Sequence, residues 1–521
     1  MHRRSSLLFT NEIAKTSPMI PIREIVQKLG IDDKYADPYG RYKAKITYDF
    51  YKDHSTDDPG KLIVIGSLDP AFERTDAQNC AIGIADAMTW DVNKKCSVVF
   101  SQPVSGPLFD DDPQMIGEGF CQLVPDEEIT THFTGDLYAF LAAVKLMFLI
   151  PEKHVLNGNM LKLDFERMMY RDLSLFETRK DTEWAGIAKE RSKWLHDLFR
   201  IPAVIDLQCA FNLAEDLNEL RSMIAKIRIA FNENGDPVTI GELKGEEQVC
   251  ALLTEAFRPN LVQTIEGYPA FVHGISLQGT GLYGGSLHTL KAALALDDIV
   301  ITSGGSLSDG SLQRNLDIRF RAEDNIRPAR IAIAFSVSAL KQYGGIDTAH
   351  LLKAGQLQEA CRKLIAEIAK YKSMYGQKPL LFISRRADDD PGELDEITET
   401  LRESLTDYCF VDTVTLGSQG GRDAAHLLYD LLLKHTAFYK NHRLTDNIKD
   451  DILSMICDET GIENAQFAEG MDERIELFRG TIAEKDVVLS IVPLYAGGTR
   501  PEGIIMGIAL LSSDIMLIYL K

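Results

Sequence analysis

The sequence has little positive charge and no long, uninterrupted hydrophobic run. Its 521 residues include 56 lysine and arginine residues against 77 aspartate and glutamate residues, so the formal net charge is -21. Nucleic acids and anionic lipids bind basic surfaces that displace counterions, and this acidic balance argues against both as partners. The most apolar stretches, 140–150 and 503–520, contain Lys145 and Asp514 respectively. We therefore expect both to be buried elements rather than membrane spans.

The cysteines lack the spacing of a metal or redox motif. There are eight, dispersed along the chain, without a CxxC pair and mostly within apolar runs. This distribution indicates reduced, buried thiols in a cytosolic protein. The N-terminal sequence has only a short apolar run before Thr10, which is too short for a secretory signal. We therefore expect a cytoplasmic protein.

Short β-rich runs alternate with helical patterns along the chain. The predicted strands are apolar on both faces, as in a parallel sheet covered by helices on both sides, and they lie at 62–66, 97–100, 299–302, 331–335, 379–383 and 487–491. Amphipathic patterns predict helices at 77–88, 213–230, 355–371 and 394–405. The sequence therefore predicts an α/β fold, with a turn between two short strands at 232–237.

The length and composition allow more than one domain. With 45% hydrophobic and 26% charged residues, a chain of this size can form about two or three domains. The composition shifts near residues 343–346, which predicts a boundary there. We expect one region at 1–345 and a second α/β region at 346–521.

Several sequence blocks resemble the formate–tetrahydrofolate ligase family and occur in that family's order. They are DPYGRYKAKI (37–46), GKLIV (60–64), HFTGD (132–136), RPNLVQTIEG (258–267), PAFVHG (269–274) and SDIM (513–516). Together they span nearly the whole chain. The resemblance implies a P-loop NTPase-like, mostly parallel sheet flanked by helices, with an inserted subdomain, within 1–345. It also implies smaller C-terminal α/β domains within 346–521, shortened because the segment after Ile491 is brief.

The resemblance also implies a reaction. Members of this family use ATP to phosphorylate formate, and they transfer the formyl group of formyl phosphate to N10 of tetrahydrofolate, usually as homotetramers. Whether the present chain keeps this activity depends on the residues at the positions that carry out the chemistry.

One stretch of the chain aligns without gaps with the family's TPxGEGKTTT-like nucleotide loop, but its chemistry is missing. Ala77 stands at the lysine position, Gln78 stands at that of the following threonine, and both loop glycines are lost. Loop glycines let backbone amides surround phosphates, the lysine neutralises them and the hydroxyl binds Mg²⁺. We expect Thr75 or Asp76 to cap the following helix, which would fill the anion site from within.

A second loss concerns the residues that hold formyl phosphate. The segment FSQPVSGP resembles the family's LREPSLGP, so Ser101 stands in place of the arginine and Gln102 in place of the glutamate. An uncharged pair cannot stabilise a transferring phosphoryl group as arginine does. The following loop is acidic, and although a solvated loop is the simpler interpretation, its carboxylates could bind a divalent metal ion through Asp110, Asp111 and Asp112.

Two later loops differ from the family as well. The GPFANIAHGCNS-like loop near the formyl and folate sites is replaced by ISLQGTGLYGGS at 275–286, and the folate-contacting WAKGGEGG loop by VTLGSQGG at 414–421. The second loop loses its tryptophan and lysine but keeps three glycines. An atypical nucleotide site would need such glycines and nearby cations, and its candidate residues are Arg385, Arg386, Gly417, Gly420 and Gly421.

Other residues of the family blocks are retained. They border the family's cleft and are either hydrogen-bonding groups of the framework or remnants of a binding site: His132, Thr134, Asp136, Asn260, Gln263, Glu266 and His273. A histidine on an apolar strand, such as His273, is usually a satisfied core group.

A retained framework with lost chemistry is typical of a pseudoenzyme. Our leading hypothesis is a ligase homologue without ATP-dependent formyl-tetrahydrofolate synthesis, which acts by binding, regulation or assembly in one-carbon folate metabolism. It would need no cofactor, would form a dimer or tetramer or join an active homologue, and would bind a folate or another small molecule. The alternative is an active ligase with an atypical nucleotide site for ATP and Mg²⁺. A third hypothesis keeps folate binding alone.

Overall fold

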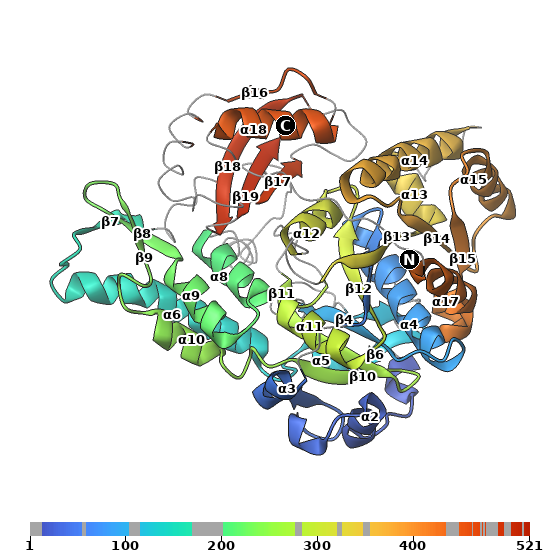
Figure 1. Ribbon diagram of the computed structural model, residues 1–521, viewed down its shortest axis with the longest axis horizontal. Helices are drawn as coiled ribbons and strands as arrows, with labels where there is room; N and C mark the ends of the chain where they lie inside the picture. Colours follow the sequence, from blue (N-terminus) through green and yellow to red (C-terminus); the bar gives the residue numbers. More distant parts are fainter. Residues whose placement is uncertain are drawn as a thin grey trace, which may run out of the picture.

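The computed structural model contains a large central sheet with helices on both faces, a mainly helical unit beside it and a smaller C-terminal sheet (Figure 1). It describes residues 13–54, 59–103, 115–168, 202–276, 284–319, 326–346, 355–433, 447–460, 462–468, 471, 475, 488–493, 502–512 and 515–520. The helices are α2 (Ile22–Leu29), α3 (Tyr48–Asp53), α4 (Asn79–Trp90), α5 (Asp126–Thr130), α6 (Asp136–Leu156), α8 (Pro202–Leu213), α9 (Leu217–Ala225), α10 (Glu246–Leu253), α11 (Leu287–Leu296), α12 (Ser311–Arg319), α13 (Val337–Tyr343), α14 (Gln356–Tyr375), α15 (Pro391–Glu403), α16 (Thr413–Leu416), α17 (Ser418–Leu432) and α18 (Ile448–Thr460), with short turns η1 (Asp33–Tyr35), η2 (Pro70–Phe72) and η3 (Glu73–Gln78).

The central sheet has twelve strands among the described residues, and its middle is parallel. Its order is β1-β2-β10-β11-β4-β12-β3-β13-β14-β15, with β6 paired to β10 and β5 to β6. Each neighbouring pair from β11 to β15 is parallel, whereas β1, β2, β10, β6 and β5 add antiparallel pairs. The strands are β1 (Ala36–Pro38), β2 (Ala44–Ile46), β3 (Lys61–Ser67), β4 (Cys96–Pro103), β5 (Gly117–Glu118), β6 (Cys121–Val124), β10 (Asn260–Thr264), β11 (Pro269–Ser276), β12 (Ile299–Ser306), β13 (Pro328–Ser336), β14 (Leu380–Ser384) and β15 (Tyr408–Val411).

The parallel strands are buried on both faces, which confirms the predicted α/β arrangement. On β3, Leu62 and Val64 pack against one group of helices, while Ile63 and Ile65 pack against the other. The first face is covered by α11 to α15 and the second by α4 and α17. Successive side chains of a strand point to opposite faces, so an uninterrupted apolar run is what a sheet covered on both sides requires.

One predicted helix is wrong. The span 213–230 covers the end of α8, the whole of α9 and the start of β8 (Arg228–Asn232). The carboxylate of Asp216 caps α9 by accepting two backbone hydrogen bonds, so a new helix begins inside the predicted one. Strand β8 pairs with β7 (Leu163–Met168) and with β9 (Pro237–Thr239), which confirms the predicted turn between β8 and β9. With α6 and α10 these elements enclose an apolar core of their own.

The C-terminal strands form a second sheet with α18 packed against it. Its order is β16-β18-β19-β17, and its strands are β16 (Gln466–Phe467), β17 (Val488–Pro493), β18 (Ile504–Ser512) and β19 (Ile515–Leu520). The strand predicted at 487–491 is β17, which belongs to this sheet rather than to the central one. In contrast, β14 and β15 continue the central sheet, so the expected division at 345/346 falls inside that sheet.

Neither of the apolar stretches forms a spanning helix. Residues 140–150 lie within α6, and β18 and β19 account for most of 503–520. Among the described residues, no helix is long and apolar enough to cross a bilayer. All eight cysteines are free thiols, of which six are buried and two are partly buried.

Candidate functional site

A row of polar side chains lies at the carboxyl ends of five neighbouring parallel strands. Each lies two residues after an apolar residue of the same strand, so both side chains point to the face covered by α4. Phe100 on β4 and Ile65 on β3 are two of these apolar residues. In open α/β sheets, ligands bind beyond the carboxyl ends of the strands. The row is buried and consists of Gln102, Ser303, Ser67, Ser336 and Ser384.

The segment in the place of the family's nucleotide loop covers this row as a continuous helical stretch. Strand β3 is followed by the short 3₁₀-helix η2, the π-helical turn η3 and then α4. The expected cap of α4 by Thr75 or Asp76 is wrong, because no side chain caps this helix. Instead, η3 runs directly into α4 and places Glu73 and Asp76 against the strand ends.

The residues at the lysine and threonine positions of that loop serve packing. Ala77 is fully buried in the core between α4 and the central sheet. Gln78 accepts a hydrogen bond from the backbone N–H of Gly117 (3.2 Å). Asn79 accepts from the N–H of Glu118 (2.6 Å) and donates to its carbonyl oxygen (3.2 Å). These contacts attach the helical stretch to β5.

Asp76 is fully buried and has two polar partners. Its carboxylate accepts hydrogen bonds from the backbone N–H (2.8 Å) and the hydroxyl (3.0 Å) of Ser336, and it pairs with Arg386 (3.0 Å). Burial raises the pKa of Asp76, while Arg386 and Ser336 oppose that effect. A carboxylate of the chain itself therefore takes the donors at the end of β13.

Arg386 follows β14 and joins three segments. Its guanidinium pairs with Glu118 (2.6 Å) as well as with Asp76, and it donates to the carbonyl oxygen of Thr75. Burial lowers the pKa of Arg386, but the two carboxylates outweigh burial and raise it, so the side chain stays charged. Its charge is already compensated by protein groups. The neighbouring Arg385 is exposed and lies over an aromatic ring of β15.

Glu73, about one turn before Asp76, also contacts the row of polar side chains at the strand ends. Its Oε2 accepts a hydrogen bond from Ser67 Oγ (3.0 Å), and only 7% of the residue is exposed. Burial raises the pKa of Glu73 to about 8, although the hydroxyls of Ser303 and Ser67 and the N–H of Gly305 oppose this. Glu73 is therefore mostly protonated at neutral pH, as expected of a carboxyl group removed from water.

The glycines considered for an atypical nucleotide site allow close packing at the start of α17. Gly417 has a φ of +58°, a conformation that favours glycine. A Cβ on Gly420 would lie 1.9 Å from the carbonyl oxygen of Asp412, and one on Gly421 would lie 2.7 Å from the backbone of Gly83 in α4. Contacts within the chain therefore account for all three glycines.

The N-terminus of α17 is occupied by a retained residue, Glu266. Its carboxylate accepts hydrogen bonds from the backbone N–H (2.8 Å) and the hydroxyl (2.6 Å) of Ser418. Because the N-terminus of a helix favours negative charge, Glu266 takes the position that an external anion would use. Glu266 is thus hydrogen-bonded to the glycine-containing loop at 414–421.

The two substituted formyl-phosphate positions lie at the end of β4. Ser101 Oγ accepts a hydrogen bond from the N–H of Gly285 (3.0 Å). Gln102 is buried, and its Oε1 has no hydrogen-bonding partner among the described residues. Neither side chain carries a charge with which to hold a phosphoryl group.

The acidic loop considered for a metal ion lies outside the described residues, as does part of the loop at 275–286. Within the described ranges, no group of three or more His, Cys, Asp or Glu side chains could hold a metal ion. The positions that lie outside the described residues are Asp110, Asp111, Asp112 and 277–283.

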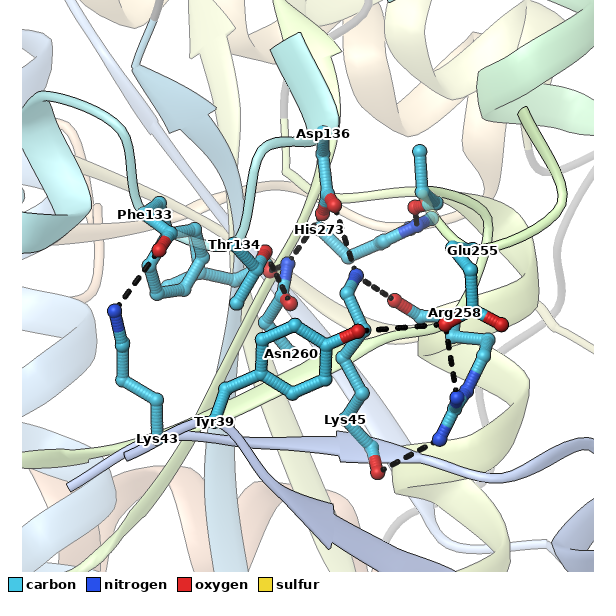
Figure 2. Close-up of polar contacts among 12 residues, drawn as sticks. Tyr39, Lys43, Lys45, Phe133, Thr134, Asp136, Glu255, Arg258, Asn260 and His273 are labelled. Carbon is cyan, nitrogen blue, oxygen red and sulfur yellow. Dashed lines mark hydrogen bonds and ion pairs between the residues drawn. The ribbon is translucent and has the colours of Figure 1, made fainter. Parts of the chain in front are cut away.

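Several retained residues form a buried hydrogen-bonded network where β2 and β10 meet α6 (Figure 2). Lys45 pairs with Asp136 (2.8 Å) and donates to the carbonyl oxygen of Arg258 (3.0 Å). Asn260 donates to the other oxygen of Asp136 (2.6 Å) and accepts from Thr134 (2.8 Å). Burial lowers the pKa of Lys45, and Asp136 opposes this. Each of these side chains is held by another protein group.

His273 and Gln263 are also hydrogen-bonded within the framework. His273 Nε2 lies 2.8 Å from the carbonyl oxygen of Ala256, and because a carbonyl only accepts, Nε2 donates while Nδ1 accepts from Ser286 Oγ (2.7 Å). Burial lowers the pKa of His273 to about 3, so the ring is neutral near pH 7. Gln263 forms two hydrogen bonds to the backbone just before α2. His132, in contrast, is exposed.

Sequence reasoning missed the cations that complete these networks. Lys45 stands between Ala44 and Ile46 in a buried strand, and a lysine flanked in this way is the signal that indicates a buried, paired ammonium group. Arg258 was not identified either. The carboxylate partners of Arg386 are 268 and 310 residues away in the sequence, and no local pattern indicates them.

The arrangement as a whole is that of a satisfied framework at the carboxyl edge of a parallel sheet. The carboxyl groups of Glu73 and Asp76 bond serines or a backbone N–H group there. That of Glu266 bonds the first residue of α17. The family model for formate–tetrahydrofolate ligase matches residues 9–489. That match includes the central sheet, the helical stretch after β3 and both hydrogen-bonded networks. The chain therefore belongs to the formate–tetrahydrofolate ligase family.

Proposed function

We propose that this chain is a formate–tetrahydrofolate ligase homologue that has lost ATP-dependent formyl-tetrahydrofolate synthesis and acts by binding, regulation or assembly. The observation that carries the proposal is the position of Asp76, in the segment where the family has its nucleotide loop. Asp76 is buried, accepts two hydrogen bonds from Ser336 and pairs with Arg386. A triphosphate there would meet carboxyl groups instead of a lysine, a hydroxyl and glycine amides.

The expected size of the loss supports the proposal. Removing one preorganised donor to a transition-state charge typically lowers a rate by ~10²- to 10³-fold. Three such positions hold Ala77, Gln78 and Ser101. Losses within one catalytic unit do not add in full, but their combined effect stays large.

The proposal extends to the setting of the protein. We infer a cytoplasmic location, since eight free thiols suit a reducing compartment, and no requirement for ATP or Mg²⁺. The intact framework around Asp136, Asn260 and Glu266 favours a role that depends on shape. The protein could form a dimer or tetramer, assemble with an active homologue, or bind a folate or another small molecule. The net charge of -21 argues against nucleic acid and anionic membranes.

The test is formate-dependent release of ADP from ATP with Mg²⁺ and tetrahydrofolate, beside an active family member at the same concentration. We expect a rate at least about 10³-fold below that of the active enzyme and no heat of MgATP binding in isothermal titration. Turnover within about tenfold of the control would overturn the proposal and favour an atypical nucleotide site. A separate titration with tetrahydrofolate measures whether folate binding is retained.

A further inference from the structure

Strand β15 forms one outer edge of the central sheet, and no described strand pairs with its far side (Figure 1). N–H groups within and just after β14 donate to the carbonyl oxygens of Asp407 (3.2 Å) and Val411 (2.8 Å). Because the backbone groups of a strand alternate in direction, the N–H and C=O groups of Tyr408 and Phe410 point away from β14. Cys409 Sγ lies 3.4 Å from the Phe410 carbonyl oxygen, which is a weak contact beside a backbone hydrogen bond. The edge therefore presents two N–H groups and two carbonyl oxygens.

The two outer edges of this sheet differ in their protection against pairing. Native sheets block an exposed edge with charged side chains, prolines or bulges. At the opposite end of the sheet, the three residues of β1 include Asp37 and Pro38. Strand β15 has the sequence YCFV and pairs with β14 without a bulge. It carries neither charge nor proline, and this contrast with β1 favours a partner strand on the β15 edge.

The sequence of β15 is self-complementary in one antiparallel register. A second copy, related by a twofold axis that passes beside Cys409, places Tyr408 of each copy opposite Phe410 of the other. These are the residues whose backbone groups point outward, and each such pair exchanges two hydrogen bonds. The register also pairs aromatic side chains, which interact favourably across antiparallel strands. Within one copy, the rings of Tyr408 and Phe410 already meet edge to face, with centroids 5.9 Å apart.

The charges at the two ends of the strand fit the same register. Thr406 and Asp412 stand two residues beyond Tyr408 and Phe410 respectively, so Thr406 of one copy lies opposite Asp412 of the other. Lys378 donates to the hydroxyl of Thr406 (2.7 Å), which brings an ammonium group to the carboxylate of the second copy. The pairing therefore joins a cation and an anion at each end of the shared edge.

We propose that β15 pairs with β15 of a second copy of this chain, about a twofold axis that passes between the two Cys409 residues, so that the two central sheets become one. The inference rests on the proposed function in one respect, because it gives the dimer considered there a surface and a register. A twofold pairing uses the β15 edges of both copies. Since Pro38 blocks β1 at the other end of each sheet, growth along the sheet stops at two copies.

Paired charge variants test the register. Tyr408→Lys and Phe410→Glu each set a charge opposite an aromatic ring, so we expect either variant alone to show half the mass of the wild type in sedimentation velocity. An equimolar mixture of the two sets the new lysine opposite the new glutamate and should restore the wild-type mass. The double variant forms two such pairs and should restore it as well. Tyr138→Lys makes the same change at an exposed tyrosine of α6 and should leave the mass unchanged.

The cysteine beside the axis gives an independent measurement. Cys409 faces its counterpart in a non-hydrogen-bonded pair, whose Cα atoms lie about 4.5 Å apart, within the range that a disulfide requires. Mild oxidation with copper phenanthroline should therefore convert the wild type into a covalent dimer on non-reducing gels. Cys409→Ser should abolish that dimer. Cys457→Ser, which removes the other partly buried thiol, should not.

Each result decides the matter. A monomeric wild type overturns the proposal, as does an oligomer whose mass Tyr408→Lys and Phe410→Glu leave unchanged, or single variants that opposite charge does not reunite. Where the charge variants do not fold, oxidation of the wild type decides, and a covalent dimer that persists in Cys409→Ser, or no covalent dimer at all, overturns the proposal. Neither measurement involves ADP release, so the interface and the proposed loss of activity can fail independently.

Discussion

At the residue scale, acidic side chains of the chain take donors that could otherwise serve a ligand. Asp76 bonds Ser336, Glu73 bonds Ser67 and Glu266 bonds Ser418. A tethered carboxyl group loses less translational freedom on binding than a free anion does. A chain that supplies its own carboxyl groups therefore keeps these strand and helix ends hydrogen-bonded without a ligand.

Arg386 should be the most sensitive single residue of this region. Arg386→Met leaves Asp76 and Glu118 without their shared cation, and breaking a buried ion pair typically costs ~3–5 kcal/mol. Urea unfolding should show a loss of this size in the free energy of unfolding. The adjacent Arg385 is exposed, so Arg385→Met is the matched control and should change that free energy by less than ~0.5 kcal/mol. Equal effects of the two substitutions would contradict the assignment.

The substitutions relative to the family's pattern can be identified from the sequence, but the contacts that the new residues make cannot. Ala77, Gln78 and Ser101 are identified by position once the resemblance is recognised. The contact between Asp76 and Ser336 joins residues 260 positions apart, and only the folded sheet brings them together. For the same reason, the sequence alone suggested that Thr75 or Asp76 caps α4, whereas no side chain caps this helix and Asp76 bonds Ser336 instead.

At the element scale, periodicity predicted the buried strands well and one helix badly. Strands such as β3 and β13 contain uninterrupted apolar runs, at 62–65 and 331–335, a pattern that a sheet covered on both faces requires. The predicted helix at 213–230 failed because Ile224 and Ile227 keep helical spacing across a point where the chain leaves the helix. The carbonyl oxygen of Ile227 accepts from the N–H of Ile240, so pairing with a distant segment decides the local conformation.

The crossing of α4 and α17 should also be sensitive to substitution, because it depends on the glycines Gly83 and Gly421. In Gly421→Ala the new Cβ would lie 2.7 Å from the backbone of Gly83, and backbone cannot move aside as a flexible side chain can. Alanine favours the helix by about 1 kcal/mol, whereas overpacking costs ~1–3 kcal/mol.

We therefore expect Gly421→Ala to lower the thermal midpoint measured by circular dichroism. Gln419 is exposed on the same helix, and Gln419→Ala is the control that should leave the midpoint unchanged or slightly raised. A Gly421→Ala protein more stable than the wild type would show that the two helices do not cross closely at this point.

At the scale of the whole molecule, the central sheet combines early and late parts of the chain. Strands β14 and β15 extend the sheet beyond β13, and α17 packs on α4. The boundary predicted from the composition shift near 343–346 therefore falls within one sheet. The small C-terminal sheet, whose first strand is β16, has its own core.

Truncation should show that β14 and β15 are needed for folding of the central sheet, whereas the C-terminal sheet is not. A fragment of residues 1–345 lacks β14, β15 and Arg386, which leaves the edge of β13 unpaired and Asp76 without its cation, so we expect insoluble protein. A fragment of residues 1–433 keeps every strand of the central sheet and should be soluble, with a cooperative thermal transition below that of the full chain. Soluble yield and circular dichroism measure both. A cooperatively folding 1–345 fragment would contradict the description of the sheet as one unit.

The burial of Ala77 bears on how such a protein can evolve. Its side chain lies in the core between α4 and the sheet, with no exposed area. A mutation that restored only a lysine there would carry an ammonium group into apolar surroundings, which is strongly unfavourable without a partner. Under the proposed function, a lysine at this one position would therefore not be enough to create a nucleotide site.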